Sequence, residues 1–153
     1  MKYQWKLRMV RYVIATLVTL ATVSEAAFAQ CNNATVSGTY RYIWTGSGSF
    51  GAAAEIVPPR PNGPFTPFAA VGLATFNGDG TSSNVDTVQV AGIVLNRSFT
   101  NTYQIGSDCR GTVTAQGASA PTANIVVAPD GSEILFINTI SGVVISGWYK
   151  KQQ

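Results

Sequence analysis

Few side chains in the sequence could carry acid/base chemistry. The 153 residues include no histidine, which removes imidazole catalysis and every histidine-ligated metal site. Asp79, Asp108 and Asp130 fall in predicted turns, where a local backbone hydrogen bond accounts for an aspartate. Asp86, Glu55 and Glu133 remain, and no spacing pairs any two of them as a general acid and base. We therefore predict no catalytic residue and no cofactor.

Nucleophile and metal motifs are also missing. Serine and threonine are plentiful, but the chain offers no obvious base beside them and no Gly-x-Ser-x-Gly motif. The stretch 77–80 contains the Asn-x-Asp-Gly portion of a calcium-binding loop, with Asp86 at that loop's twelfth position. Thr75 stands at the first position, which should be acidic, and the preceding sequence is strand-like. We predict no metal site.

Aromatic side chains are the more informative set. Tyr40, Tyr42 and Trp44 are spaced by two and share one face of the first predicted strand. If that face points inward, the three rings line one side of a cavity and offer a small ligand apolar contact and hydrogen-bonding tips. The alternative is an ordinary packed core, because small eight-stranded barrels can be filled by their own side chains.

The elements that must position these rings are short strands. β-Branched and aromatic residues recur in short runs, and no stretch sustains a helical apolar pattern. An additional strand over Ser49–Val57 is weakly indicated. The main predicted strands are Ser37–Thr45, Ala69–Asn77, Asn84–Val90, Ser98–Ile105, Gly111–Gln116, Thr122–Ala128, Glu133–Thr139 and Gly142–Lys150.

Tight turns order these strands. The stretches 77–80, 107–111 and 129–131 are rich in Gly, Asn and Asp, which tolerate left-handed backbone. Successive strands should therefore be antiparallel neighbours. About eight such strands fit an all-β, up-and-down barrel, and a two-sheet sandwich is the alternative.

A proline-rich segment interrupts the pattern. Five prolines within residues 58–67 exclude a central strand and favour extended backbone. We expect a long surface loop, either a stiff connector or a lid or recognition segment.

The first 29 residues predict an export signal. A basic start and an uncharged run from Tyr12 to Val23 precede Ala27-Phe28-Ala29, so we expect cleavage after Ala29 and a secreted or periplasmic location. The apolar run is too short for a spanning helix, so no stable membrane insertion is expected after cleavage. Residues 30–153 then form a single barrel domain with six basic and six acidic residues, and this formal neutrality argues against nucleic acid as a partner.

Both cysteines lie in the exported part. In an oxidising compartment Cys31 and Cys109 can pair only with each other within one chain. We predict a structural disulfide, since the sequence lacks the CxxC spacing of a redox pair.

The last predicted hairpin carries apolar groups on both faces. Leu135 and Ile137 oppose Ile134 and Phe136. Its outer face is therefore a candidate for cover by a protein partner, a second copy in a homodimer, or the long loop.

The segments Val36–Tyr40, Phe68–Gly72, Thr75–Gly80 and Asp108–Val113 resemble a loose group of small exported bacterial proteins without an assigned activity. The resemblance covers most of the chain after residue 29 and implies export and a β-barrel rather than a function. Gly38-Thr39-Tyr40 is also similar to the start of avidin-type and other calycin barrels. No biotin-site pattern is present, and the resemblance assigns no ligand residue.

The leading functional expectation is an exported, non-enzymatic β-barrel that binds a small apolar ligand or a protein partner. A cell-surface interaction or structural protein is the first alternative. A cavity enzyme of the cyclase or isomerase type is the second, and it would need a polar group such as Asp86 or Glu55 inside the cavity. An outer-membrane barrel ranks last, because several strands are shorter than the ~10 residues that one requires.

Overall fold

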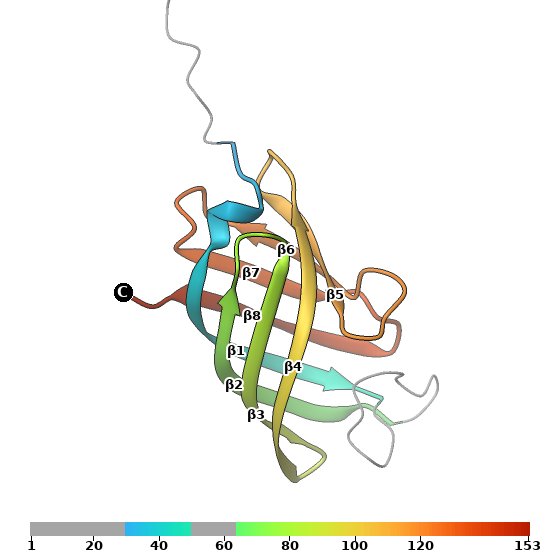
Figure 1. Cartoon of the computed structure of the whole chain (residues 1–153). Helices are drawn as coiled ribbons and strands as arrows, with labels where there is room; N and C mark the ends of the chain where they lie inside the picture. The colour runs from blue at the N-terminus through green and yellow to red at the C-terminus, as the bar shows by residue number, and fades with distance from the viewer. Residues whose placement is uncertain (1–29, 50–63) are drawn as a thin grey trace, which may run out of the picture.

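The computed structural model describes residues 30–49 and 64–153, whose strands close into one antiparallel barrel (Figure 1). The strands pair in chain order, and β8 pairs back with β1. This confirms the predicted up-and-down barrel and excludes the sandwich. The strands are β1 Gly38–Gly48, β2 Thr66–Phe76, β3 Thr81–Val90, β4 Ile93–Ile105, β5 Arg110–Ala115, β6 Ala123–Val127, β7 Glu133–Asn138 and β8 Val143–Lys151.

Some expectations fall outside the described residues. These are the export signal of residues 1–29, Glu55 and most of the proline-rich segment. Of the additional strand Ser49–Val57 only Ser49 is described, and it belongs to no strand. No helix in the described ranges is long and apolar enough to cross a membrane.

Side chains alternate between the interior and the outer face of the barrel. In β8, Val143, Ile145 and Tyr149 are buried inside. β3 alternates as regularly, but its inward set is partly polar. That set is Ser82, Asn84, Asp86, Val88 and Val90.

A short 3₁₀ helix, η2 (Asn33–Val36), lies at the end of the barrel where β1 begins (Figure 1). Val36 is fully buried there. Asn33 ties the helix to β4, because its Oδ1 accepts the Ile105 N–H (2.9 Å) and its carbonyl oxygen accepts the Tyr103 hydroxyl (3.2 Å). We call this the η2 end, and the opposite end, where the Ala91–Gly92 turn joins β3 to β4, the hairpin end.

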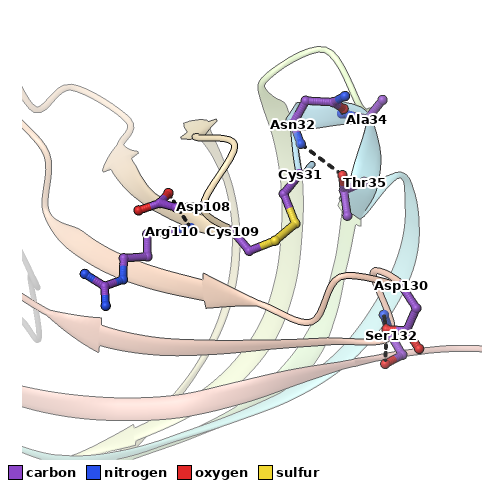
Figure 2. Close-up of a disulfide and its surroundings, with 9 residues drawn as sticks. All are labelled: Cys31, Asn32, Ala34, Thr35, Asp108, Cys109, Arg110, Asp130 and Ser132. Carbon is purple, nitrogen blue, oxygen red and sulfur yellow. Dashed lines mark hydrogen bonds between the residues drawn. A yellow bond between two sulfur atoms is a disulfide. The ribbon is translucent and has the colours of Figure 1, made fainter. Parts of the chain in front are cut away.

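The predicted disulfide is present at the η2 end (Figure 2). Cys31 bonds to Cys109, 78 positions later, and thereby links the segment before η2 to the β4–β5 turn. A disulfide in the folded barrel is consistent with the oxidising environment of the periplasm or the cell exterior.

Two sequence predictions need correction. β4 begins at Ile93 rather than Ser98, because Ala91 and Gly92 both adopt positive φ (52° and 82°) and close a tight hairpin. Pro67 lies within β2, although the prolines around it were expected to exclude a strand. It is the second residue of β2, a place near a strand end where a missing N–H is tolerated.

The wall of the barrel is incomplete beside the first half of β4. β5 pairs with β4 only along Asn101–Ile105. Residues 93–100 of β4 have no strand partner on that side among the described residues, although Thr100 bonds to Gln116. The inward residues Leu95, Arg97 and Phe99 therefore remain partly exposed.

Candidate functional site

The three aromatic residues singled out from the sequence all point into the barrel. Their exposed fractions rise along β1 from the η2 end toward the hairpin end: 0% for Tyr40, 3% for Tyr42 and 8% for Trp44. The Tyr40 hydroxyl donates to the Gly131 carbonyl oxygen (2.5 Å), so this ring belongs to the packing of the η2 end. Only Tyr42 and Trp44 belong to the site described next.

Trp44 stacks against two other rings. Its centroid lies 4.7 Å from that of Tyr42 and 5.0 Å from that of Phe136, with interplanar angles of 30° and 13°. Gly147 makes this possible, because it is the register partner of both Trp44 and Phe136. A Cβ at position 147 would lie 2.8 Å from Trp44 Cδ1. A glycine on β8 therefore lets two large rings meet across it.

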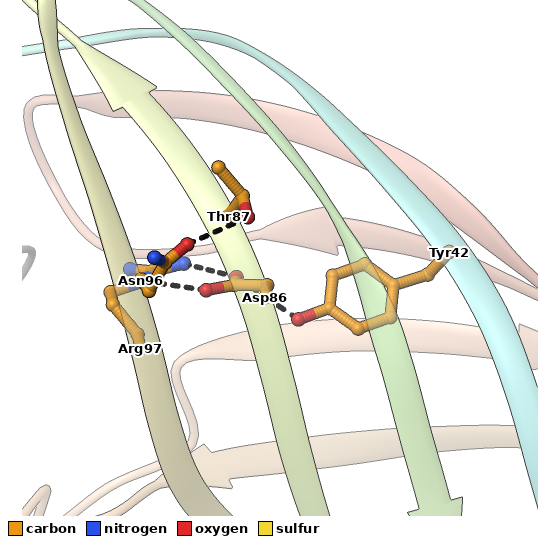
Figure 3. Close-up of polar contacts among 5 residues, drawn as sticks. All are labelled: Tyr42, Asp86, Thr87, Asn96 and Arg97. Atoms are coloured by element: carbon orange, nitrogen blue, oxygen red, sulfur yellow. Dashed lines mark hydrogen bonds and ion pairs between the residues drawn. The ribbon is translucent and has the colours of Figure 1, made fainter.

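A second glycine lets a polar cluster form across four strands. Tyr42 pairs with Gly72, Gly72 with Asp86, and Asp86 with Arg97. A Cβ at position 72 would lie 2.6 Å from the Asp86 Cβ. With no side chain there, the Tyr42 hydroxyl reaches past β2 and donates to Asp86 Oδ2 (3.0 Å; Figure 3).

Arg97 completes this cluster with an ion pair inside the barrel. Its Nε donates to Asp86 Oδ1 (2.9 Å) and its Nη2 donates to Asp86 Oδ2. The Asp86 side chain is fully buried, whereas 20% of the Arg97 side chain is exposed. The guanidinium carbon also lies 5.2 Å from the Phe99 ring centroid and 6.0 Å from that of Phe68, within cation–π range.

Sequence reasoning named Asp86 as a polar group that could lie inside, but it missed Arg97. For Asp86 the available signal was its place in the strand alternation, since Asp86, Val88 and Val90 lie on the same face of β3. Arg97 had no such signal, because the predicted strand began at Ser98 and left Arg97 outside it.

Two buried polar atoms of the interior form no hydrogen bond with any of the described residues. They are Trp44 Nε1 and Asn84 Oδ1. Burial raises the pKa of the nearby Tyr149 hydroxyl, and the Trp44 N–H opposes that rise, although the two groups do not form a hydrogen bond. Burying an unpaired polar group costs about 1–3 kcal/mol, so these atoms mark a place where a further polar group would be accommodated.

The remaining acidic residues have local structural roles. Asp79 accepts hydrogen bonds from the N–H (2.8 Å) and hydroxyl (2.7 Å) of Thr81, and Asp130 does the same for Ser132 (3.0 and 2.7 Å; Figure 2). Asp108 accepts the Arg110 N–H (3.2 Å; Figure 2). Hydrogen bonds from Thr81 and Ser132 hold the pKa of Asp79 and of Asp130 below the usual range. The described residues contain no group of three metal-ligating side chains.

All four tyrosines after residue 29 are buried, which yields a prediction about alkaline pH. Burial raises the pKa of Tyr40 to about 12 and raises the pKa of Tyr42, Tyr103 and Tyr149 as well. Because each folded-state pKa exceeds the unfolded value of 10.0, stability present below pH 10 should fall as pH rises through the folded values. We expect tyrosinate absorbance to appear only as the barrel unfolds, above pH 10.

An ultraviolet titration with circular dichroism recorded in parallel measures this. The chain in guanidinium chloride serves as the control and should titrate near pH 10. Tyrosinate formation near pH 10 with an intact barrel spectrum would contradict the burial of these hydroxyls.

A shallow open depression also lies on the outer face of β2–β4. Outward side chains border it, and Thr87 and Asn96 in its rim bond to each other (Oγ1 to Oδ1, 2.8 Å). It is lined by Val71, Gly72, Val85, Asp86, Thr87, Asn96, Arg97 and Ser98. The Asp86 carboxylate is buried and bonded on the inner side, so this depression offers a ligand little chemistry.

Comparisons with family models, curated proteins and solved structures found no match to this chain. The resemblance to small exported bacterial proteins stays a prediction.

Proposed function

We propose that the chain is an exported barrel that binds a small, largely apolar molecule in its aromatic interior, next to Trp44. The observation that carries this proposal is the pair of unsatisfied polar atoms, Trp44 Nε1 and Asn84 Oδ1, within an interior lined by aromatic rings. A filled structural core has no reason to keep a buried indole N–H without an acceptor. Apolar walls with a few polar groups are typical of small-molecule sites.

Access to the interior supports the same proposal. Exposure rises toward Trp44 along β1, and the unpaired part of β4 leaves Arg97 and Phe99 partly exposed. The Asp86 carboxylate already accepts three hydrogen bonds, one from Tyr42 and two from Arg97, which favours binding over proton transfer and places the cyclase or isomerase alternative behind it.

The test uses two single-tryptophan variants of residues 30–153. Trp148→Phe leaves Trp44 as the reporter inside, and Trp44→Phe leaves Trp148, whose ring lies beside Lys150 (Nζ 5.1 Å from the centroid) on the outer face. 1-Bromonaphthalene quenches tryptophan by contact. We expect saturable quenching of Trp44 and little quenching of Trp148. Equal quenching of both, or none, would reject binding in the interior.

Homodimerisation is a second candidate, favoured by the outer face of β6–β8. Leu135 and Ile137 point outward and are 53% and 54% exposed. Val126, the register partner of Leu135, is 50% exposed, and Val144 on β8 is 63% exposed. Native mass spectrometry of the protein purified from its host tests both candidates. Mass lost on denaturation indicates a retained ligand, whereas a monomeric chain mass at micromolar concentration rejects the dimer.

A further inference from the structure

Among the described residues, the hydrogen-bonding groups left without a partner in and around the aromatic interior are mainly donors. Trp44 Nε1–H has no partner. Arg97 donates from Nε and Nη2 to Asp86, and its Nη1 makes no hydrogen bond to the described residues. Asp86 already accepts from Arg97 twice and from Tyr42. A molecule that enters here meets free N–H groups, so it must supply an acceptor.

The charges of Asp86 and Arg97 limit which acceptor group the ligand can carry. Asp86 is the only charged residue in the buried set of described residues, and Arg97 compensates it. A carboxylate ligand would bring a second negative charge beside Asp86 into surroundings that solvate ions poorly. An ammonium ligand would face the Arg97 guanidinium. An uncharged acceptor, such as a carbonyl oxygen, avoids both costs.

The surrounding aromatic rings limit which ligand shapes fit. The Phe99 centroid lies 6.2 Å from that of Trp44, and the Arg97 guanidinium carbon lies 5.2 Å from the Phe99 centroid. Phe99 therefore lies between the two groups in contact range, near the Trp44 ring and near the Arg97 guanidinium, and Phe136 stacks on Trp44. Planar conjugated molecules pack well against such rings, by stacking or by edge contacts.

We infer that the ligand is an uncharged planar aryl or conjugated carbonyl compound whose oxygen accepts hydrogen bonds from Trp44 Nε1 and Arg97. This inference rests on the proposed function and makes it specific. The lone acceptor Asn84 Oδ1 lies one register step nearer the η2 end, since Asn84 pairs with Phe99 and Asp86 with Arg97. A hydroxyl or N–H on the ligand body would satisfy it.

The experiment compares three 6-bromonaphthalenes that differ only at position 2, with an acetyl, a carboxylate or an ethyl group. Contact quenching of Trp44 in the Trp148→Phe chain gives each dissociation constant at neutral pH. We expect the ketone to bind about tenfold more tightly than the other two, the usual worth of a hydrogen bond at a buried site. Equal affinities, or preference for the carboxylate, would overturn the carbonyl assignment while interior binding stands. Quenching by none of the three would reject the proposed function itself.

A charge substitution sharpens the test. Asp86→Asn leaves Arg97 uncompensated, so the carboxylate should now bind about tenfold more tightly relative to the ketone than before. Glu133→Gln is the matched control, because it removes the same charge from an exposed pair with Lys150 (3.6 Å) and should leave the ranking unchanged. An unchanged ranking in a folded Asp86→Asn chain would overturn the role of Arg97. If that variant does not fold, the ranking in the chain with native Asp86 decides alone.

Discussion

Replacing Arg97 by methionine should lower the free energy of unfolding by about 3–5 kcal/mol, the usual cost of stripping a buried charge of its partner. Methionine keeps much of the apolar stem that packs near Phe99 and Phe68. The loss therefore comes mainly from the Asp86 carboxylate, which is fully buried and, among the described residues, keeps Tyr42 as its one remaining side-chain donor. Urea denaturation followed by tryptophan fluorescence measures the change.

Two further variants identify the cause of that loss. Adding Asp86→Asn to Arg97→Met removes the stranded charge and should recover a large part of the lost stability. Glu133→Gln breaks the exposed pair with Lys150 and should cost less than about 1 kcal/mol. If Arg97→Met costs no more than Glu133→Gln, the interior ion pair stabilises the barrel no more than an exposed pair does.

Removing the disulfide is the second change with a large expected effect. The Cys31→Ala/Cys109→Ala chain should lose about 4 kcal/mol, because the bridge closes a loop of 78 positions in the unfolded state. The folded state should loosen at the η2 end in particular. There Asn33 holds the Ile105 N–H, and without the bridge the amide exchange of Ile105 should accelerate.

Reduction provides the control for this prediction. Dithiothreitol should shift the urea midpoint of the native chain to that of the double-alanine chain and should leave the double-alanine chain unchanged. A native midpoint that does not respond to full reduction would show that the bridge contributes nothing to stability.

Alternation and turn composition sufficed to predict the barrel. The eight strand cores are correct because inward and outward residues alternate over stretches such as β3 and β8. The disulfide was predictable because two cysteines leave a single pairing within the chain. The β3–β4 hairpin was not, since its turn begins with an alanine at positive φ rather than with asparagine or glycine.

The interior cluster depends on register, which local patterns do not determine. Asp86 and Arg97 meet because the two-residue turn aligns them as direct partners across β3 and β4. Tyr42 joins them because the neighbouring strand offers a glycine at the matching position. The face that Tyr42 and Trp44 share follows from their spacing, whereas what each of them contacts follows from Gly72 and Gly147.

The η2 end has a practical consequence for attaching the protein to a surface. Tyr40 near the start of β1 pairs with Lys151 at the end of β8, and the Gln152 N–H donates to the Thr39 carbonyl oxygen (2.9 Å). The start of β1 and the end of β8 therefore both lie at the η2 end, which also carries the disulfide, and away from the hairpin end, toward which exposure rises from Tyr40 to Trp44. A sensor chip or carrier domain joined after residue 153 would leave the hairpin end, where we propose that the ligand enters, facing solution.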